Sequence, residues 1–123
     1  MSQQDGMIHA ADLRDKIALV TGAARGLGSA AVRLFAAHGA SVVVCDVREE
    51  EGESLAAELR GSGHSARFLA LDVSSADDWE RVGQTVAREL GALHILVNNA
   101  AIILRRGITE ATPSDWRDRK SVV

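Results

Sequence analysis

The chain has 123 residues, which suits one domain, and its 46% hydrophobic and 25% charged residues are ordinary for a folded globular protein. A formal net charge of -3 provides no uniform field to attract nucleic acid, and no apolar run approaches the roughly 18 residues of a membrane span. The sequence contains no tyrosine, so any mechanism that needs a phenol within this chain is excluded.

Short apolar runs alternate with amphipathic stretches along the chain, which is the pattern of a parallel α/β sheet. Residues 1–12 are polar and lack the apolar core of a signal peptide, so we expect a flexible leader. Four runs are predicted strands, over residues 17–21, 41–46, 67–72 and 94–98. Their centres are continuously apolar, which is typical of strands covered by helices on both faces.

The first two helices are predicted over residues 26–38 and 49–60. Gly39 is expected to end the first helix, and acidic residues at the start of the second suit the positive end of the helix dipole. In the first helix, the spacing predicts an apolar stripe that packs on the sheet, made of Leu27, Ala31, Leu34 and Phe35.

A third helix is predicted over residues 75–90, with Ser75 as its N-cap and Asp78 as the acid of a capping box. Its apolar face is expected to consist of Trp79, Val82, Val86 and Leu90. A fourth helix is expected to start at Thr112, with Pro113 as its first residue.

Right-handed crossovers place the four strands in the spatial order 3-2-1-4, the amino-terminal part of a Rossmann-type doubly wound α/β fold. We expect this partial domain over residues 13–116 and an off-pattern tail over 117–123. The outer side of the fourth strand is then bare, which predicts self-association through an uncovered sheet edge.

A glycine-rich stretch, Thr21–Gly28, joins the first strand to the first helix. Glycines there let backbone amides and the helix amino terminus approach an anion such as a pyrophosphate. Read from Gly26, the stretch has the G-x-G-x-x-A form of the dinucleotide fingerprint, and read from Gly22 it has the variant G-x-x-x-G-x-G. The alternative is a tight turn that needs glycine only for its backbone angles.

Asp46 stands at the end of the second strand, where a carboxylate accepts both ribose hydroxyls of an adenosine. The alternative for Asp46 is a helix N-cap or a surface turn. An acid at this place repels a 2′-phosphate and so favours NAD over NADP. Arg25 is a counter-signal, because a basic residue in the glycine loop can pair with that phosphate. We weight Asp46 above Arg25.

Four elements in this order and spacing resemble the amino-terminal half of a short-chain dehydrogenase/reductase: Thr21–Gly28, Asp46, Leu71–Val73 and Asn98–Ala101. The resemblance covers about Leu13–Trp116. It implies an NAD(P)-dependent oxidoreductase that transfers a hydride between an alcohol and a carbonyl. It implies cofactor-binding roles for Gly22, Arg25, Gly26, Leu27, Gly28, Asp46, Asp72, Val73, Asn99 and Ala100.

The resemblance also implies where each part of the cofactor lies. The glycine-loop backbone lines the pyrophosphate, and Asp46 takes the adenine ribose. Asp72 and Val73 hold the adenine, while Asn99 and Ala100 lie beside the nicotinamide ribose. Thr21 and Asn98 brace the central strands. Members of the family usually have glycine where this chain has Ala101, which is a mild change.

The family's catalytic groups have no match in this chain. Members continue through a helix with an asparagine, a strand ending in a serine, and a Tyr-x-x-x-Lys pair that performs the proton transfer. Residues 117–123 fit a reading-frame shift, a foreign terminus or a divergent end. His38 and His94 are expected to lie away from the nicotinamide, so we assign no catalytic residue. We therefore expect a truncated chain that binds the dinucleotide weakly and is not catalytic alone.

Two other classes of function remain as alternatives. One is a stand-alone, non-catalytic nucleotide-binding or interaction module. The other is a methyltransferase, which the Asn98–Ala101 segment argues against. The single cysteine, Cys45, cannot form an internal disulfide, and the four histidines are too scattered to ligate a metal. These features favour a cytoplasmic protein without a metal site, and they leave its substrate unspecified.

Overall fold

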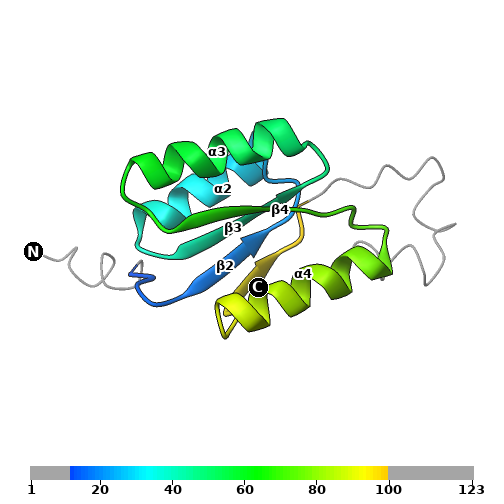
Figure 1. Ribbon diagram of the computed structural model, residues 1–123. Coiled ribbons are helices and arrows are strands. Elements are labelled where there is room, and N and C mark those ends of the chain that lie inside the picture. Colours follow the sequence, from blue (N-terminus) through cyan, green and yellow to red (C-terminus); the bar gives the residue numbers. More distant parts are fainter. Residues whose placement is uncertain (1–11, 100–123) are drawn as a thin grey trace, which may run out of the picture.

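The computed structural model describes residues 12–99, which form a parallel sheet with helices on both faces (Figure 1). The strand order is β4-β3-β2-β5, so the predicted order 3-2-1-4 is confirmed. The elements are β2 (Ile17–Val20), α2 (Gly26–Ala37), β3 (Ser41–Asp46), α3 (Glu49–Gly61), β4 (Ala66–Ala70), α4 (Ala76–Glu89) and β5 (Ile95–Val97). Each predicted strand and helix in this range is confirmed to within two residues at its ends. Of the leader predicted over 1–12, residues 1–11 lie outside the described residues, as do the helix predicted from Thr112 and the tail.

Helices α2 and α3 lie on one face of the sheet, and α4 lies on the other (Figure 1). The two central strands therefore bury both sides of their pleat. Val42 and Val44 of β3 belong to the cluster under α2 and α3, whereas Val43 and Cys45 belong to the cluster under α4. These four side chains are at most 1% exposed. The prediction of apolar strands covered on both faces is confirmed for β2 and β3.

The apolar stripe predicted for α2 was wrong in two of its members. Leu27 is 81% exposed and Leu34 is 56% exposed, and the buried face consists of Gly28, Val32 and Ala36. The rotation of the helix is fixed by Gly28, because a β-carbon there would overlap the carbonyl oxygen of Gly22. The other two members of the stripe, Ala31 and Phe35, are partly buried and pack against the core. Close backbone approach at Gly28 thus acts together with the apolar Val32 and Ala36 in setting which face of α2 meets the sheet.

The predicted cap of α4 is half right. The Ser75 hydroxyl accepts a hydrogen bond from the backbone amide of Asp78 at 3.1 Å, as expected of an N-cap. The capping-box role of Asp78 was wrong, because its carboxylate accepts from the amide of Asp72 at 2.9 Å. The Ser75 amide already donates to the carbonyl of Asp72, which leaves Asp78 to tighten the turn between β4 and α4.

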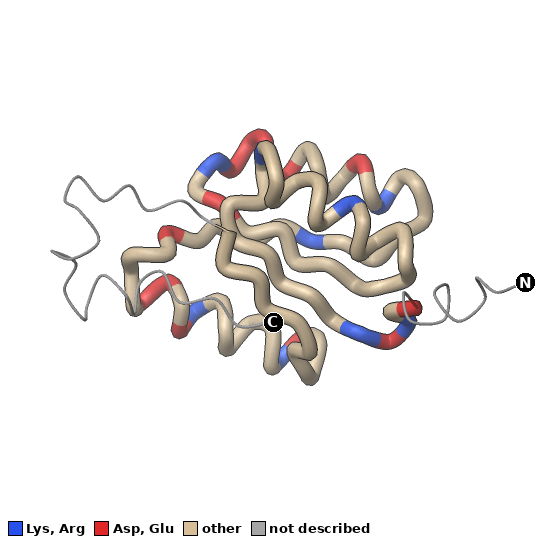
Figure 2. Tube along the Cα trace, turned by 180° about the vertical axis from the view of Figure 1, so that it is seen from behind, with Lys and Arg blue, Asp and Glu red and all other residues tan. Residues whose placement is uncertain are grey.

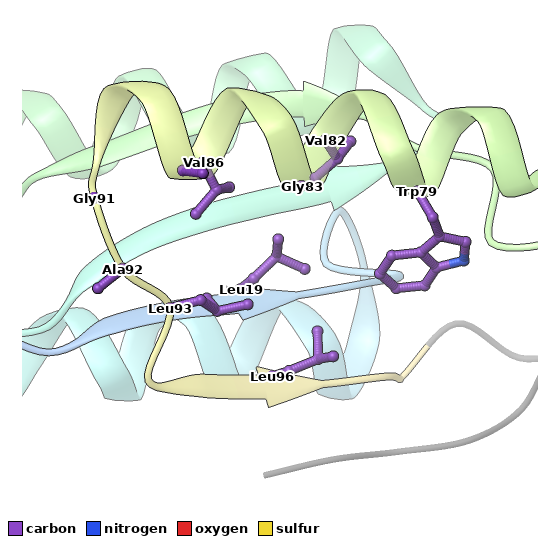
Figure 3. Close-up of a pocket in the computed structure, with 10 residues that line it drawn as sticks. Leu19, Trp79, Val82, Gly83, Val86, Gly91, Ala92, Leu93 and Leu96 are labelled. Atoms are coloured by element: carbon purple, nitrogen blue, oxygen red, sulfur yellow. The ribbon is translucent and has the colours of Figure 1, made fainter.

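The predicted apolar face of α4 is confirmed and borders a groove of about 250 Å³ against β2 and β5. Trp79 and Val86 extend from the helix to the side where Leu19 of β2 and Leu96 of β5 lie (Figure 3). Val82 also lines the groove. A right-handed connection that continued from β5 to a further strand would cross this face of the sheet. Because α4 lines the groove, the groove is on the opposite face of the sheet from α2 and α3.

Neither membrane spans nor metal clusters occur within residues 12–99. None of the helices there is both long enough and apolar enough to cross a bilayer. The same residues contain no group of three histidine, cysteine, aspartate or glutamate side chains that could hold a metal ion.

The corrected burial of α2 gives a direct test of the fold. Val32→Ala should lower the free energy of unfolding by about 2 kcal/mol, because it removes buried methyl groups from the core. Leu27→Ala removes more atoms from the same helix but should change stability by less than about 0.5 kcal/mol, because the side chain is exposed. Urea unfolding followed by circular dichroism measures both, and a larger cost for Leu27 would contradict the observed rotation.

Burial also determines the reactivity of Cys45. Removal from water raises the pKa of its thiol to about 12, so the reactive thiolate is essentially absent at pH 8. We expect a thiol reagent such as dithionitrobenzoate to leave the folded chain unmodified at pH 8 and to titrate one thiol after unfolding in urea. Fast modification of the folded chain would show that β3 is less well covered than described.

Candidate functional site

A cleft of about 540 Å³ lies at the carboxyl ends of the strands, where a doubly wound sheet places its ligands. The predicted site residues that line it are Gly22, Arg25, Gly26, Asp46, Asp72, Val73 and Asn99. Leu27 and Gly28 do not line it, and Ala100 lies outside the described residues. Three further lining residues, Val47, Arg48 and Leu71, were not predicted as site residues. The sequence pattern thus located most of the wall of one cleft.

Three glycines of the loop are needed for two different reasons. Gly22 and Gly26 have φ angles of +59° and +58°, in the left-handed region that favours glycine. Gly28 is needed for space, because its β-carbon would also lie 2.8 Å from Nδ2 of Asn99. The loop is therefore more than a tight turn, since Gly28 brings the start of α2 against both the loop carbonyl and the end of β5.

The amino terminus of α2 differs from those of the other two described helices. It has no acidic residue in its first turn, and its N-cap Arg25 makes no side-chain cap. In contrast, α3 carries Glu49, Glu50 and Glu51 in its first turn, and α4 has the Ser75 cap and two aspartates. The free amides and positive dipole end of α2 are thus the ones left open to an anion at the cleft.

Asp46 is only 4% exposed and is fixed by backbone donors. Its Oδ2 accepts from the amide of Ala24 at 3.0 Å, and its Oδ1 accepts from the amide of Arg48 at 2.9 Å. Oδ1 also accepts from Nη1 of Arg48 at 3.4 Å, so of the two carboxylate oxygens it is Oδ2 that retains capacity for one further donor. The alternative interpretation of Asp46 as a turn residue is therefore part of its role, because Asp46 ties the glycine loop to the β3–α3 turn. It also lines the cleft, where Oδ2 is the oxygen with a lone pair to spare.

Arg25 and Arg48 share a carboxylate that the sequence had not marked as part of a site. Arg25 donates two hydrogen bonds to Glu51, from Nε at 2.9 Å and Nη2 at 3.1 Å. Arg48 approaches the same group, with its Nε 3.8 Å from Oε1 of Glu51. Hydrogen bonding from Arg25 lowers the pKa of Glu51, which keeps this carboxylate ionised. The only sequence signal had been the general preference for acids in the first turn of a helix.

The Asp72–Val73 segment is held by its own turn. Oδ1 of Asp72 accepts from the backbone amide and the hydroxyl of Ser74, at 2.9 Å and 2.7 Å. These bonds lower the pKa of the Asp72 carboxyl. The Val73 carbonyl accepts from Nε1 of Trp79 at 2.9 Å. This wall of the cleft is therefore ordered by the start of α4.

Thr21 joins the end of β2 to the end of β5. Its hydroxyl donates to Oδ1 of Asn98 at 2.8 Å and accepts from the amide of Asn99 at 2.9 Å. The side chain of Asn99 then reaches the carbonyl of Gly22, at 3.5 Å from Nδ2. The bracing of these strands by Thr21 and Asn98 is thus visible as hydrogen bonds, and it sets where Asn99 enters the cleft.

The two histidines considered as bases lie elsewhere. His94 accepts a hydrogen bond on Nδ1 from the amide of Ile17 at 3.0 Å, at the amino end of β2 and so at the opposite end of the sheet from the cleft. His38 follows the last residue of α2, where its carbonyl accepts from the amide of Leu13. Both positions agree with the expectation that neither residue faces the cleft.

Comparison with known proteins places this arrangement among oxidoreductases. The chain is 38% identical over 109 residues to trans-4-hydroxycyclohexanecarboxylate dehydrogenase of Sinomonas cyclohexanicum, which covers 84% of the chain and 42% of that protein. It is 41% identical over 102 residues to a 3-alpha-(or 20-beta)-hydroxysteroid dehydrogenase of Mycobacterium tuberculosis, which covers 83% of the chain and 38% of that protein. The chain therefore spans about two fifths of the length of these relatives.

A solved structure supports the same assignment. Gluconate 5-dehydrogenase from Burkholderia cenocepacia, in complex with NADP and tartrate, superimposes with a TM-score of 0.73 at 32% identity, over 92% of this chain and 44% of that one. The short chain dehydrogenase family matches residues 16–122. Sequence motifs, strand order and comparisons agree: the chain belongs to the short-chain dehydrogenase/reductase family, whose members are NAD(P)-binding oxidoreductases with a Rossmann-type fold.

Proposed function

We propose that the cleft binds a nicotinamide dinucleotide, with the pyrophosphate at the amino terminus of α2 and the adenine ribose at Asp46. The observation that carries the proposal is the contrast between helix ends: α2 alone, among the described helices, has neither an acid in its first turn nor a side-chain cap. Gly28 supports the same placement, because its missing side chain lets this helix end approach the loop closely.

Different walls of the cleft then contact different parts of the cofactor. Asp72 and Val73 hold the adenine, and Asn99, with Ala100, contacts the nicotinamide ribose. When bound, the nicotinamide ring supplies or accepts the hydride. The part of the protein described here binds and orients. It fixes Asp46 by two backbone amides and Asn99 through Thr21, so that the acceptor groups are in place before the cofactor arrives.

The reaction that we propose for a full-length protein with this cofactor half is hydride transfer between an alcohol and a carbonyl carbon. Such a reaction needs an acid or base at the substrate oxygen, and this sequence contains no tyrosine to supply it. We infer that the 123 residues, with a partial domain over 13–116, bind the dinucleotide weakly and do not turn over an alcohol alone. The names of the relatives include steroid and cyclic alcohol dehydrogenases, which supports an alcohol or carbonyl substrate.

We further propose that NAD is preferred over NADP and that the protein is cytoplasmic. Asp46 supports the cofactor preference, because a carboxylate at the ribose repels a 2′-phosphate. The buried Cys45, with no second cysteine in the chain, supports a reducing compartment.

Substitution of Asp46 tests the cofactor assignment. Asp46→Ala should weaken NAD binding by about 10- to 100-fold, because it removes charge-assisted hydrogen bonds to the ribose. Titration calorimetry on the 123-residue chain measures the change, with the exposed Asp77→Ala on α4 as a control that should bind like wild type. Tight NADP binding that does not respond to Asp46 would contradict the assignment.

The outer edge of β5 generates a second test. Within residues 12–99 this strand pairs only with β2, and Leu93 beside it is 42% exposed in the groove under α4. We propose that the chain self-associates through this edge. Leu93→Lys should shift sedimentation velocity profiles toward monomer, whereas Leu34→Lys on the exposed side of α2 should not. A concentration-independent monomer for the wild-type chain would overturn this proposal.

A further inference from the structure

Glu51 is outside the cleft, yet it controls two charges that line it. Its carboxylate binds Arg25 through two hydrogen bonds and also pairs with Arg48, whose Nε lies 3.8 Å from Oε1. Arg25 and Arg48 both line the cleft next to Asp46, whereas Glu51 faces the neighbouring surface hollow between α2 and α3. One glutamate on the first turn of α3 therefore holds the two basic side chains at the ribose end of the cleft.

The four charged groups at this end balance one another. Arg25 and Arg48 face two carboxylates, because Arg48 also lies 3.4 Å from Oδ1 of Asp46. The side chain of Asp46 is 3% exposed and is engaged with backbone amides, whereas the side chain of Glu51 is 44% exposed. The charges are unevenly distributed on the helices, because α2 carries Arg33 and no acid, whereas α3 begins with three glutamates (Figure 2). The local balance at the cleft therefore depends on Glu51.

A 2′-phosphate on the adenine ribose is the ligand group that this balance affects. Guanidinium groups bind phosphate with bidentate hydrogen bonds, and two of them beside the ribose would make a strong phosphate site. With Glu51 ionised, Arg25 already uses Nε and Nη2 on a carboxylate. An incoming phosphate would have to break that pair before it gained the same hydrogen bonds.

We propose that Glu51 is a specificity-determining residue for the cofactor, because it pairs with Arg25 and Arg48 and withholds both from a 2′-phosphate. The inference rests on the proposed binding of a dinucleotide in this cleft. Discrimination against NADP then has two parts. Asp46 repels the phosphate at the ribose itself, and Glu51 occupies the arginines that would otherwise compensate for that repulsion. Arg25, the counter-signal in the sequence, is neutralised by a residue on the next helix.

The experiment compares two isosteric substitutions one residue apart. Glu51→Gln removes the charge that pairs with the arginines, while Glu50→Gln removes the same charge from the same helical turn. Glu50 is exposed and has no ion pair within residues 12–99, so it is a matched control. NAD and NADP are titrated separately into each 123-residue chain at low ionic strength, and backbone amide shifts in NMR spectra give the dissociation constants and report the fold.

Glu51→Gln should lower the ratio of the NADP to the NAD dissociation constant by about tenfold, whereas Glu50→Gln should change it by less than about threefold. The gain should come from tighter NADP binding with NAD binding little changed, and it should shrink at 0.5 M NaCl. Adding Arg25→Ala to Glu51→Gln should remove most of the gain, because the released guanidinium is then missing.

The outcomes separate this inference from the function on which it rests. If the wild-type chain binds neither dinucleotide, the proposed function fails, and the role of Glu51 fails with it. If NAD binds but the two glutamine variants shift the ratio equally, only a general charge effect operates and the role of Glu51 is overturned. Equal losses of NAD and NADP affinity in Glu51→Gln would likewise overturn it, because they would indicate a structural role.

Discussion

The contact between Gly28 and the carbonyl of Gly22 sets how α2 is placed beside the cleft. Because a side chain on residue 28 would overlap that carbonyl and crowd Asn99, α2 lies closer to the loop than any other residue would permit. This approach fixes the rotation of the helix, which buries Val32 and Ala36 and leaves Leu27 in solvent. It also brings the open amino terminus of α2 to the ends of the strands. Packing of the core and the position of this uncapped helix end thus both depend on one contact.

Two hydrogen-bonded side chains connect the glycine loop and the end of β2 to the neighbouring strands. Thr21 links β2 to the residues that follow β5, and Asp46 links the end of β3 to the glycine loop. Both are buried polar groups whose hydrogen bonds are made within the protein, so each is fixed where it lies. The cleft is therefore rigid where acceptor groups are needed. The exposed arginines at its rim are held by a weaker, salt-sensitive ion pair.

The described helices cover the two faces of the sheet to different extents. The face under α2 and α3 is closed by a continuous cluster from Ala18 to Ala66. The other face has α4 alone among the described helices, and the groove beside it is walled by leucine, valine and tryptophan side chains. An apolar surface of this kind favours burial against further protein. The groove borders β5, which is the edge strand of the sheet within residues 12–99, whereas the cleft lies at the carboxyl ends of the strands.

The sequence by itself determined the strand order, the helices and most of the cleft wall, because apolar periodicity, glycine spacing and the end-of-strand acid are local signals. It also determined family membership, through motifs whose order survives even where each motif alone is weak. Only the tertiary structure decided which apolar residues of α2 are buried, since the close approach at Gly28 turns Val32 and Ala36 toward the sheet and leaves Leu27 and Leu34 exposed. Only the tertiary structure paired Arg25 with Glu51, because residues on different helices meet through the packing of α2 beside α3, which no local pattern encodes.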